Sequence, residues 1–124
     1  MKFRIYYDDT DAQGIVYHAN YFKFCERARS EYIFSKLGKD AFTPTNYFVI
    51  AEIKAKFKGA AKLADTIEIR SKCATITDVS VILEQEILLE NKVIFKAEVK
   101  LAYLENGVLS KIPQKFKDIL EQIL

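Results

Sequence analysis

The sequence predicts an α+β fold in which one antiparallel sheet curls around a single long helix. Three observations in the 124 residues lead to this prediction. One long stretch near the N-terminus has the apolar spacing of a helix, and five other stretches alternate with the two-residue period of strands. Most of those strands follow one another with only short turns between them. A helix and a sheet bury their apolar faces against each other, so the sheet is expected to wrap around the helix.

The first element is a strand over residues 2–7, where Phe3, Ile5 and Tyr7 occupy alternate positions on one face. A polar loop follows, in which Gly14 gives the backbone freedom in φ.

The long helix is expected to begin at Ala19 or Asn20 and to end near Leu37 and Gly38, a residue that suits the left-handed position after a helix. One helical stripe should be buried. Its residues are Tyr21, Cys25, Ala28 and Tyr32.

Four strands come next, over residues 47–58, 66–75, 79–90 and 92–105. We expect them to pair as an antiparallel meander. A tight turn at Asn91 joins the last two, and Asn106-Gly107, a strong hairpin signal, leads into a short return strand at 108–112. Residues 113–124 carry apolar side chains at helical spacing after Pro113, which predicts an amphipathic closing helix.

The strand at 47–58 has a regular alternation that predicts which side chains face the helix. The inward set is Tyr47, Val49, Ala51, Ile53, Ala55 and Phe57. Small residues in the sheet let the helix lie close; these are Ala51, Ala55 and Ala97. A half-wrapped sheet leaves bare edge strands, which favours oligomerisation.

The composition is that of one soluble domain spanning residues 1–124, with 50% hydrophobic residues and a net charge of +2. So small a charge argues against nucleic acid or a membrane surface as the main partner. The N-terminus lacks the apolar segment of a signal peptide, and no apolar run is long enough for membrane insertion. Cys25 and Cys73 are not a close pair, so we expect reduced thiols and a cytoplasmic location.

The stretch "DDTDAQGIVYHANY", residues 8–21, concentrates more polarity than a plain turn needs. Ile15 and Val16 should anchor it in the core and leave Asp11 and His18 at its two ends. The helix behind it begins with free backbone N–H groups and a positive dipole end, which can hold a developing oxyanion. A carboxylate, an imidazole and such a helix terminus are sufficient for acyl transfer.

Plainer interpretations exist for each residue. Asp8 and Asp9 can be solvated turn residues, Asp11 an Asx-turn carboxylate, His18 a structural hydrogen-bonding group and Asn20 an N-cap. One histidine with scattered carboxylates offers no closed ligand set, so no metal is expected. Cys25 lies on the buried stripe and is not expected to be a nucleophile. The residues alone indicate only a carboxylate site before a helix.

Residues 6–32 resemble the signature of the hotdog-fold acyl-CoA thioesterases of the 4-hydroxybenzoyl-CoA thioesterase superfamily, and are most similar to the bacterial Tol–Pal-associated branch. The matching positions are Tyr7, Asp9, Thr10, Asp11, Gly14, Val16, Tyr17, His18, Tyr21, Glu26, Arg27, Ala28 and Arg29. The order of elements agrees with the hotdog fold, a five-stranded antiparallel sheet around one helix. Gln13 departs from the small or acidic residue usual in this branch, which leaves the acyl preference open.

The resemblance implies hydrolysis of acyl-CoA to free acid and CoA, without cofactor or metal. Asp11 would be the catalytic carboxylate, as nucleophile or as general base. The backbone N–H of His18 would be the oxyanion donor, and its side chain would orient the carbonyl or the water. Tyr17 and Asn20 would shape the entrance of the site. Supporting positions around it would be Tyr7, Thr10, Gly14, Glu26 and Arg29.

Coenzyme A carries phosphates, and no glycine-rich phosphate loop is present, so cationic side chains would have to bind them. The candidates are Lys54, Lys56, Lys58 and Lys62. The resemblance also implies sites formed between protomers, hence a homodimer, which can assemble further into a dimer of dimers.

Two other functions stay open. A hotdog hydratase or dehydratase also uses an acidic residue and a histidine, but its Gly-Asp-x-Asn-Pro setting is absent here. A non-enzymatic protein that binds acyl carrier protein or the Tol–Pal machinery is the other alternative.

Overall fold

The computed structural model describes residues 1–123 and contains one curved sheet, one long helix and one short helix. In chain order the elements are β1 (Lys2–Arg4), a 3-10 turn η1 (Tyr7–Asp9), α1 (Asn20–Leu37), β2 (Asn46–Phe57), β3 (Thr66–Ile76), β4 (Ser80–Leu89), β5 (Lys92–Glu105), β6 (Val108–Leu109) and α2 (Gln114–Leu120). Neither helix within this range combines the length and the apolarity needed to cross a membrane.

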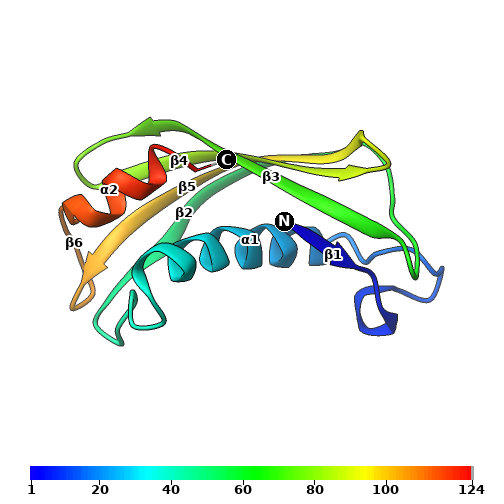
Figure 1. The fold of residues 1–124 in the computed structure, drawn as a ribbon, viewed down its shortest axis with the longest axis horizontal. Helices are drawn as coiled ribbons and strands as arrows, with labels where there is room; N and C mark the ends of the chain where they lie inside the picture. Colours follow the sequence, from blue (N-terminus) through cyan, green and yellow to red (C-terminus); the bar gives the residue numbers. More distant parts are fainter. Residues whose placement is uncertain (124) are drawn as a thin grey trace.

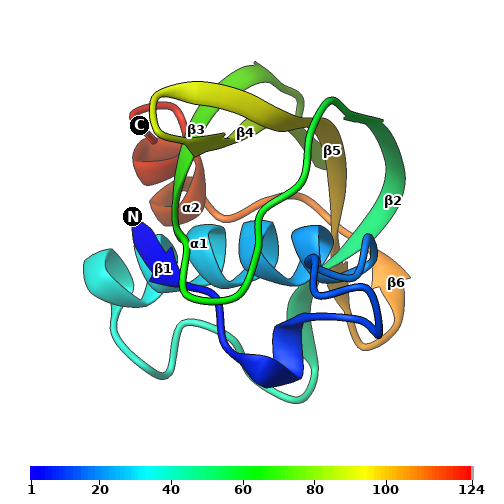
Figure 2. The same ribbon diagram turned by 90° about the vertical axis from the view of Figure 1, so that its right-hand side faces the viewer.

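The sheet arches over α1, as the sequence predicts (Figure 1). Its strands run in the order β1-β3-β4-β5-β2, with β6 added to β5, and all pairings are antiparallel. In the second view the sheet again passes over α1, with β1 and β2 at its two edges (Figure 2). This is the hotdog arrangement that the resemblance implies.

The expected meander is correct only for β3, β4 and β5. β2 pairs with β5 instead of β3, so it forms the opposite edge of the sheet. Consecutive strands tend to be neighbours, and that tendency fails here because α1 fills the concave side and needs strands around both of its flanks.

The alternation expected for β2 is wrong in its first half. A β-bulge between Ile50 and Glu52 leaves Ala51 unpaired and exposed, so the strand changes phase there. Phe48 therefore faces the helix side, opposite Tyr103, in place of Tyr47 and Val49. Beyond the bulge the expected inward residues, from Ile53 to Phe57, keep their face.

The first strand is shorter than the period-two pattern suggests. It ends at Arg4, and the chain turns through η1, which leaves Tyr7 82% exposed instead of inward. Ile5 still enters the core with 1% exposure, because its N–H and C=O bond the crossover between β2 and β3 at Asp65 and Ala64.

The core lies between α1 and the inner face of the sheet. The predicted stripe on α1 is confirmed, with Tyr21, Cys25 and Ala28 buried and Tyr32 partly buried. Ala97 is buried beneath the helix, and its small side chain allows the close approach expected from the sequence. Apolar burial of this kind supplies most of the stability of such a domain.

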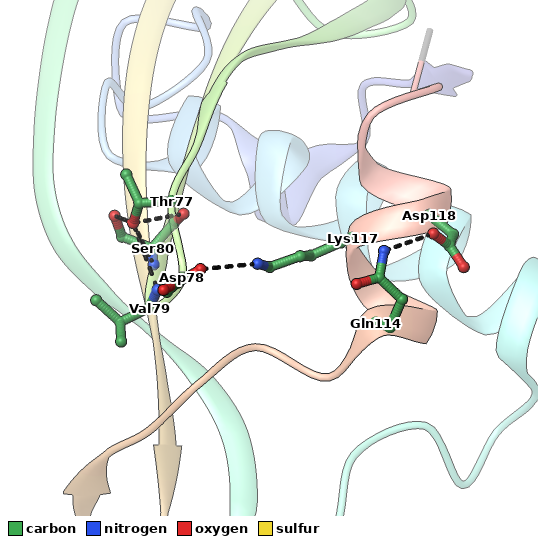
Figure 3. A network of polar contacts seen from close by, with 7 residues as sticks. All are labelled: Thr77, Asp78, Val79, Ser80, Gln114, Lys117 and Asp118. Atoms are coloured by element: carbon green, nitrogen blue, oxygen red, sulfur yellow. Dashed lines mark hydrogen bonds and ion pairs between the residues drawn. The ribbon is translucent and has the colours of Figure 1, made fainter.

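The closing helix packs its apolar face on the far end of the sheet, where Phe116 stacks on Phe42 at 5.9 Å between ring centroids. The turn between β3 and β4 is joined to this helix (Figure 3): Lys117 pairs with Asp78 at 3.3 Å, and Thr77 bonds Ser80 at 2.8 Å within the turn. This end of the molecule is opposite the polar loop.

One polar group sits in the centre of the inner face. Gln85 of β4 is fully buried, and its amide donates to the backbone oxygen of Cys25 and to Ser71 Oγ, both at 3.0 Å. Its Oε1 accepts a hydrogen bond from the Arg29 guanidinium at 3.2 Å. Burial lowers the pKa of Arg29 from its ordinary value, with the neighbouring Cys25 and Glu26 raising it in part. Gln85 thus holds α1 to the sheet and keeps a buried cation hydrogen-bonded.

We expect Gln85→Leu to lower the free energy of unfolding by about 3 kcal/mol, because it removes the acceptor of a buried charged donor. Urea denaturation measures the loss. Ser71→Ala is the matched control: it removes another bond of the same amide but leaves the bond to Arg29, and should cost about 1 kcal/mol. Equal losses in the two variants would show that the buried cation does not depend on Gln85.

Candidate active site

The polar loop folds as a tight hairpin of its own. Thr10 and Val16 form an isolated antiparallel bridge, the N–H of Asp11 donates to Ile15 O at 2.9 Å, and the N–H of Gly14 returns to Asp11 O at 3.0 Å. Gly14 has φ of +80°, a conformation that side chains other than hydrogen disfavour. Asp11 therefore occupies a defined position at the start of the hairpin.

The Asp11 carboxylate forms an Asx turn. Its Oδ1 accepts the backbone N–H of Gln13 at 2.8 Å, and no hydrogen bond found within residues 1–123 uses its Oδ2. The side chain is partly exposed. The turn role considered from sequence is therefore real, and it leaves one carboxylate oxygen open to a substrate or a water molecule.

Ile15 and Val16 anchor the hairpin as expected. Val16 is 3% exposed and donates its N–H to Ala61 O at 2.9 Å, and Ile15 bridges Lys62. Both partners belong to residues 58–65, the crossover between β2 and β3. The hairpin is therefore attached to a second loop and not only to the helix that follows it.

The entrance to α1 has unused N–H groups. The carbonyls of Tyr17 and His18 accept the N–H groups of Asn20 and Tyr21, at 2.8 and 3.4 Å, which begins the first turn. The N–H groups of His18 and Ala19 take part in none of the hydrogen bonds found within residues 1–123. Free donors at the positive end of a helix dipole form a site for negative charge.

The His18 side chain is exposed and lies among aromatic rings. Its ring centroid is 4.5 Å from that of Tyr17 and 6.1 Å from that of Phe57, which meets it edge-on. Tyr17 is 46% exposed. Phe57 was expected only as a core residue, but it ends β2 beside His18 and stays 49% exposed. The sequence feature that could have indicated this role is the position of Phe57 as the last inward residue of the strand.

Asn20 and Asp9 fix the loop against the helix. Asn20 is the first helical residue, and Ala19 holds the N-cap position without a side-chain hydrogen bond, so the N-cap interpretation of Asn20 is wrong. The Asn20 amide instead donates to Asp9 O at 2.9 Å, where the N–H of Tyr17 also donates at 3.0 Å. A capping role for Asn20 would require α1 to begin at Tyr21. Because α1 begins at Asn20 itself, the Asn20 side chain is available to bond Asp9 O.

Asp9 is not a solvated turn residue. It is only 9% exposed, and its carboxylate accepts the N–H of Tyr6 at 2.9 Å, which closes η1. Asp8 next to it is exposed, as expected. Thr10 Oγ1 donates to Tyr7 O at 3.2 Å, a local bond that holds the start of the hairpin.

Glu26 and Arg29 lie farther along α1, and their hydrogen bonds go to Ser30 and Gln85 instead of the loop. Both side chains line a cavity of about 520 Å³ between α1 and the first half of β2. The remaining lining is mostly apolar: Ile33, Phe34, Phe42, Phe48, Ile50 and Leu101 are among its residues.

Three of the four candidate lysines point away from the helix. Lys54 and Lys56 alternate with the inward residues of β2, and with Lys58 they line a hollow of about 430 Å³ on the outer face of the sheet. The Nζ atom of Lys54 lies 3.8 Å from Oε1 of Glu52. Lys56 lies directly opposite Lys96 in the β2–β5 register, a pairing of like charges that disfavours the sheet.

Lys62 is placed differently from these three residues. It lies in the crossover, bridged to Ile15, and so next to the hairpin that carries Asp11.

Neither thiol is arranged as a nucleophile. Burial raises the pKa of Cys25 to about 12, although the charge of the nearby Arg29 acts in the opposite direction. Cys25 therefore stays a thiol at neutral pH. Burial, followed by the charge of Glu121, also raises the pKa of Cys73. The reactive groups of the site are thus oxygen and nitrogen groups.

Known proteins resemble this chain over most of its length. The family model of the thioesterase superfamily matches residues 13–95. The chain is similar to the acyl-CoA thioesterase YbgC of Helicobacter pylori strain 26695, at 40% identity over 99% of this chain and 100% of that protein. It also resembles the acyl-CoA thioester hydrolase YbgC of Escherichia coli O157:H7, at 37% identity over 77% of this chain and 74% of that protein.

Solved structures share the fold. A gentisyl-coenzyme A thioesterase superposes with a TM-score of 0.86 at 26% identity, over 96% of this chain and 97% of that one. A protein from Aquifex aeolicus gives a TM-score of 0.88 at 26% identity, over 97% of both chains. With a family model that covers most of the chain and a relative that matches it from end to end, this protein belongs to the thioesterase superfamily, as a hotdog-fold member of the YbgC type.

Proposed function

We propose that this protein is an acyl-CoA thioesterase that hydrolyses the thioester to a free acid and CoA. The single observation that carries the proposal is that one ordered segment holds both a carboxylate with an open oxygen, Asp11, and the unused N–H of His18 at the start of α1. The names of its relatives, which are thioester hydrolases acting on acyl-CoA, support the same reaction.

Asp11 would act on the thioester carbonyl through the oxygen that the Asx turn leaves free. As a general base it takes a proton from water, whose oxygen adds to the carbonyl carbon. As a nucleophile it adds to that carbon itself and forms an anhydride that water then cleaves. In either case the C–S bond breaks, CoA leaves as a thiolate that takes up a proton, and one water is consumed for each thioester.

The N–H of His18 would donate to the oxyanion that forms when the carbonyl carbon becomes tetrahedral. It is fixed before the substrate binds, because the helix turn and the bonds to Asp9 O hold the backbone on both sides. Donors that need no rearrangement stabilise the transition state most. The rings of Tyr17 and Phe57 beside the imidazole would keep the thioester away from bulk water.

The lysines at the end of β2 would bind the phosphates of CoA. Phe57 contacts His18 on the inner side of the sheet, and its neighbours Lys56 and Lys58 face the outer side. The candidate active site and the lysine-lined hollow therefore meet at the end of β2. The like-charge pair of Lys56 and Lys96 supports an anion there, because a bound phosphate relieves their repulsion. Lys62 lies beside the hairpin, bridged to Ile15.

A second copy of the chain belongs to the proposal. β2 has twelve residues and, within residues 1–123, pairs with β5 alone, so one side of a long strand is open to another strand. Ile50 and Phe57, each 49% exposed, add apolar surface beside this edge. These features support a homodimer through β2, from which a dimer of dimers can form.

Asp11→Asn should lower kcat by about 100-fold or more, because it removes the base or nucleophile. The Asn side chain keeps an oxygen for the bond to Gln13, so the hairpin should persist. The measurement is thiol release from acyl-CoAs with chains from C2 to C16 and one aromatic acyl group. Asp8→Asn, an exposed carboxylate in the same loop, is the matched control and should retain full activity.

Equal activity of the Asp11 and Asp8 variants would make Asp11 purely structural. If the wild type released thiol from no acyl-CoA but bound acyl carrier protein, the binding function would replace catalysis. A single turnover in ¹⁸O-labelled water tests the nucleophilic role of Asp11. In the anhydride route, water that attacks Cγ of Asp11 leaves the label in its carboxylate, whereas the general-base route puts the label only in the released acid.

The double variant Lys56→Ala, Lys96→Ala should raise KM by about 10-fold or more and leave kcat unchanged, since the phosphates lie far from the reacting carbon. Steady-state kinetics at low and high salt measure this, and the wild-type advantage should shrink as salt screens the charges. Lys36→Ala, at the other end of α1, is the control. A fall in kcat with constant KM would contradict a phosphate-binding role.

A further inference from the structure

The crossover between β2 and β3 runs past the beginning of α1. Because these two strands lie toward opposite edges of the sheet, residues 58–65 have to span its open end, and they pass in front of the helix there (Figure 2). Ala61, in the middle of this crossover, is completely buried.

A chain of hydrogen bonds connects α1 to the hairpin through this crossover. The N–H of Ala61 donates to the hydroxyl of Tyr21 at 3.1 Å, and Ala61 O accepts the N–H of Val16 at 2.9 Å. Val16 pairs with Thr10, which precedes Asp11, and is followed by Tyr17 and His18. One hydroxyl in the first turn of α1 thus connects to both ends of the segment that carries the two proposed catalytic groups.

We propose that Tyr21 is a positioning residue for thioester hydrolysis: its hydroxyl holds Ala61, and through Ala61 it fixes the spacing of Asp11 and the N–H of His18. This inference rests on the proposed function of those two groups. The hydroxyl does not touch the substrate in this scheme, and its effect is on the geometry of the loop.

The hydroxyl and the ring of Tyr21 have separate tasks. The ring stacks on Phe95 at 5.4 Å between centroids and packs near Phe57 at 6.1 Å, which is ordinary core packing. The hydroxyl alone accepts the N–H of Ala61, a donor with no access to water. Burial raises the pKa of Tyr21, so the hydroxyl stays neutral through the working pH range.

Tyr32 provides a matched comparison on the same helix. Its hydroxyl also bonds a backbone group of another segment, Ile119 O at the end of α2. That contact belongs to the opposite end of the molecule from the hairpin (Figure 1). Tyr21→Phe and Tyr32→Phe therefore each remove a hydroxyl oxygen from the same helix. Only Tyr21→Phe breaks the hydrogen bond to Ala61 that supports the hairpin.

The experiment compares these two variants with the wild type. Tyr21→Phe should lower kcat by about 10-fold or more with KM changed less than about 2-fold, because misplaced catalytic groups cost rate more than binding. Tyr32→Phe should keep kcat within about 2-fold. Thermal unfolding is recorded for both variants, and a kcat loss confined to Tyr21→Phe cannot be explained by general destabilisation.

Hydrogen exchange supplies a readout that does not depend on activity. The amides of Val16 and of the hairpin should exchange about 10-fold faster or more in Tyr21→Phe and at the wild-type rate in Tyr32→Phe. Unchanged exchange, or equal kcat losses in the two variants, would overturn the proposal. If the wild type hydrolyses no thioester, the proposed function fails, and the exchange data still decide whether the Tyr21 hydroxyl orders the loop.

Discussion

The position of β2 at the far edge of the sheet is the constraint on which the rest of the structure depends. α1 has to be covered on both flanks, so β2 and β3, which are consecutive in the chain, are separated in the sheet by β4 and β5. The chain between them must then cross the open end beside the start of α1. That crossing buries Ala61 and gives Val16 a partner, which is why the hairpin with Asp11 is ordered without a strand of its own.

In this site, one group of a residue stabilises the loop while another group of the same residue is free for the substrate. One oxygen of Asp11 holds the Asx turn while the other is open, and the backbone of His18 supplies a free donor while its carbonyl starts the helix. Such sharing lets a small protein keep its reactive groups rigid, because the bonds that maintain the loop also orient them. Rigid orientation before binding is the property that makes polar groups effective in catalysis.

Local patterns in the sequence predict local structure well here. The boundaries of α1 and β5, the turn at Asn106-Gly107 and the anchoring of Val16 all follow from periodicity or turn chemistry. The place of β2, its bulge and the burial of Asp9 do not, because they depend on contacts between segments distant in sequence. The motif located the candidate site, whereas the roles of Phe57 and Gln85 became visible only with the packing.

The bulge in β2 has a consequence for how this strand tolerates change. Phe48 and Phe57 are separated by an odd number of positions, yet both lie on the helix side because Ala51 is left out of the ladder. The side chain of Ala51 is thus of little importance, and so is its place in the chain: Ile50 and Glu52 already pair with adjacent residues of β5, Leu101 and Lys100, so deleting Ala51 would close the ladder and keep both halves on their faces. An extra residue within one of the paired halves would instead turn part of the strand over. Phe57 would then lose His18, or Phe48 would lose its contact with Phe116. In this strand the one position that can be removed without changing which side chains face the helix is the bulge itself.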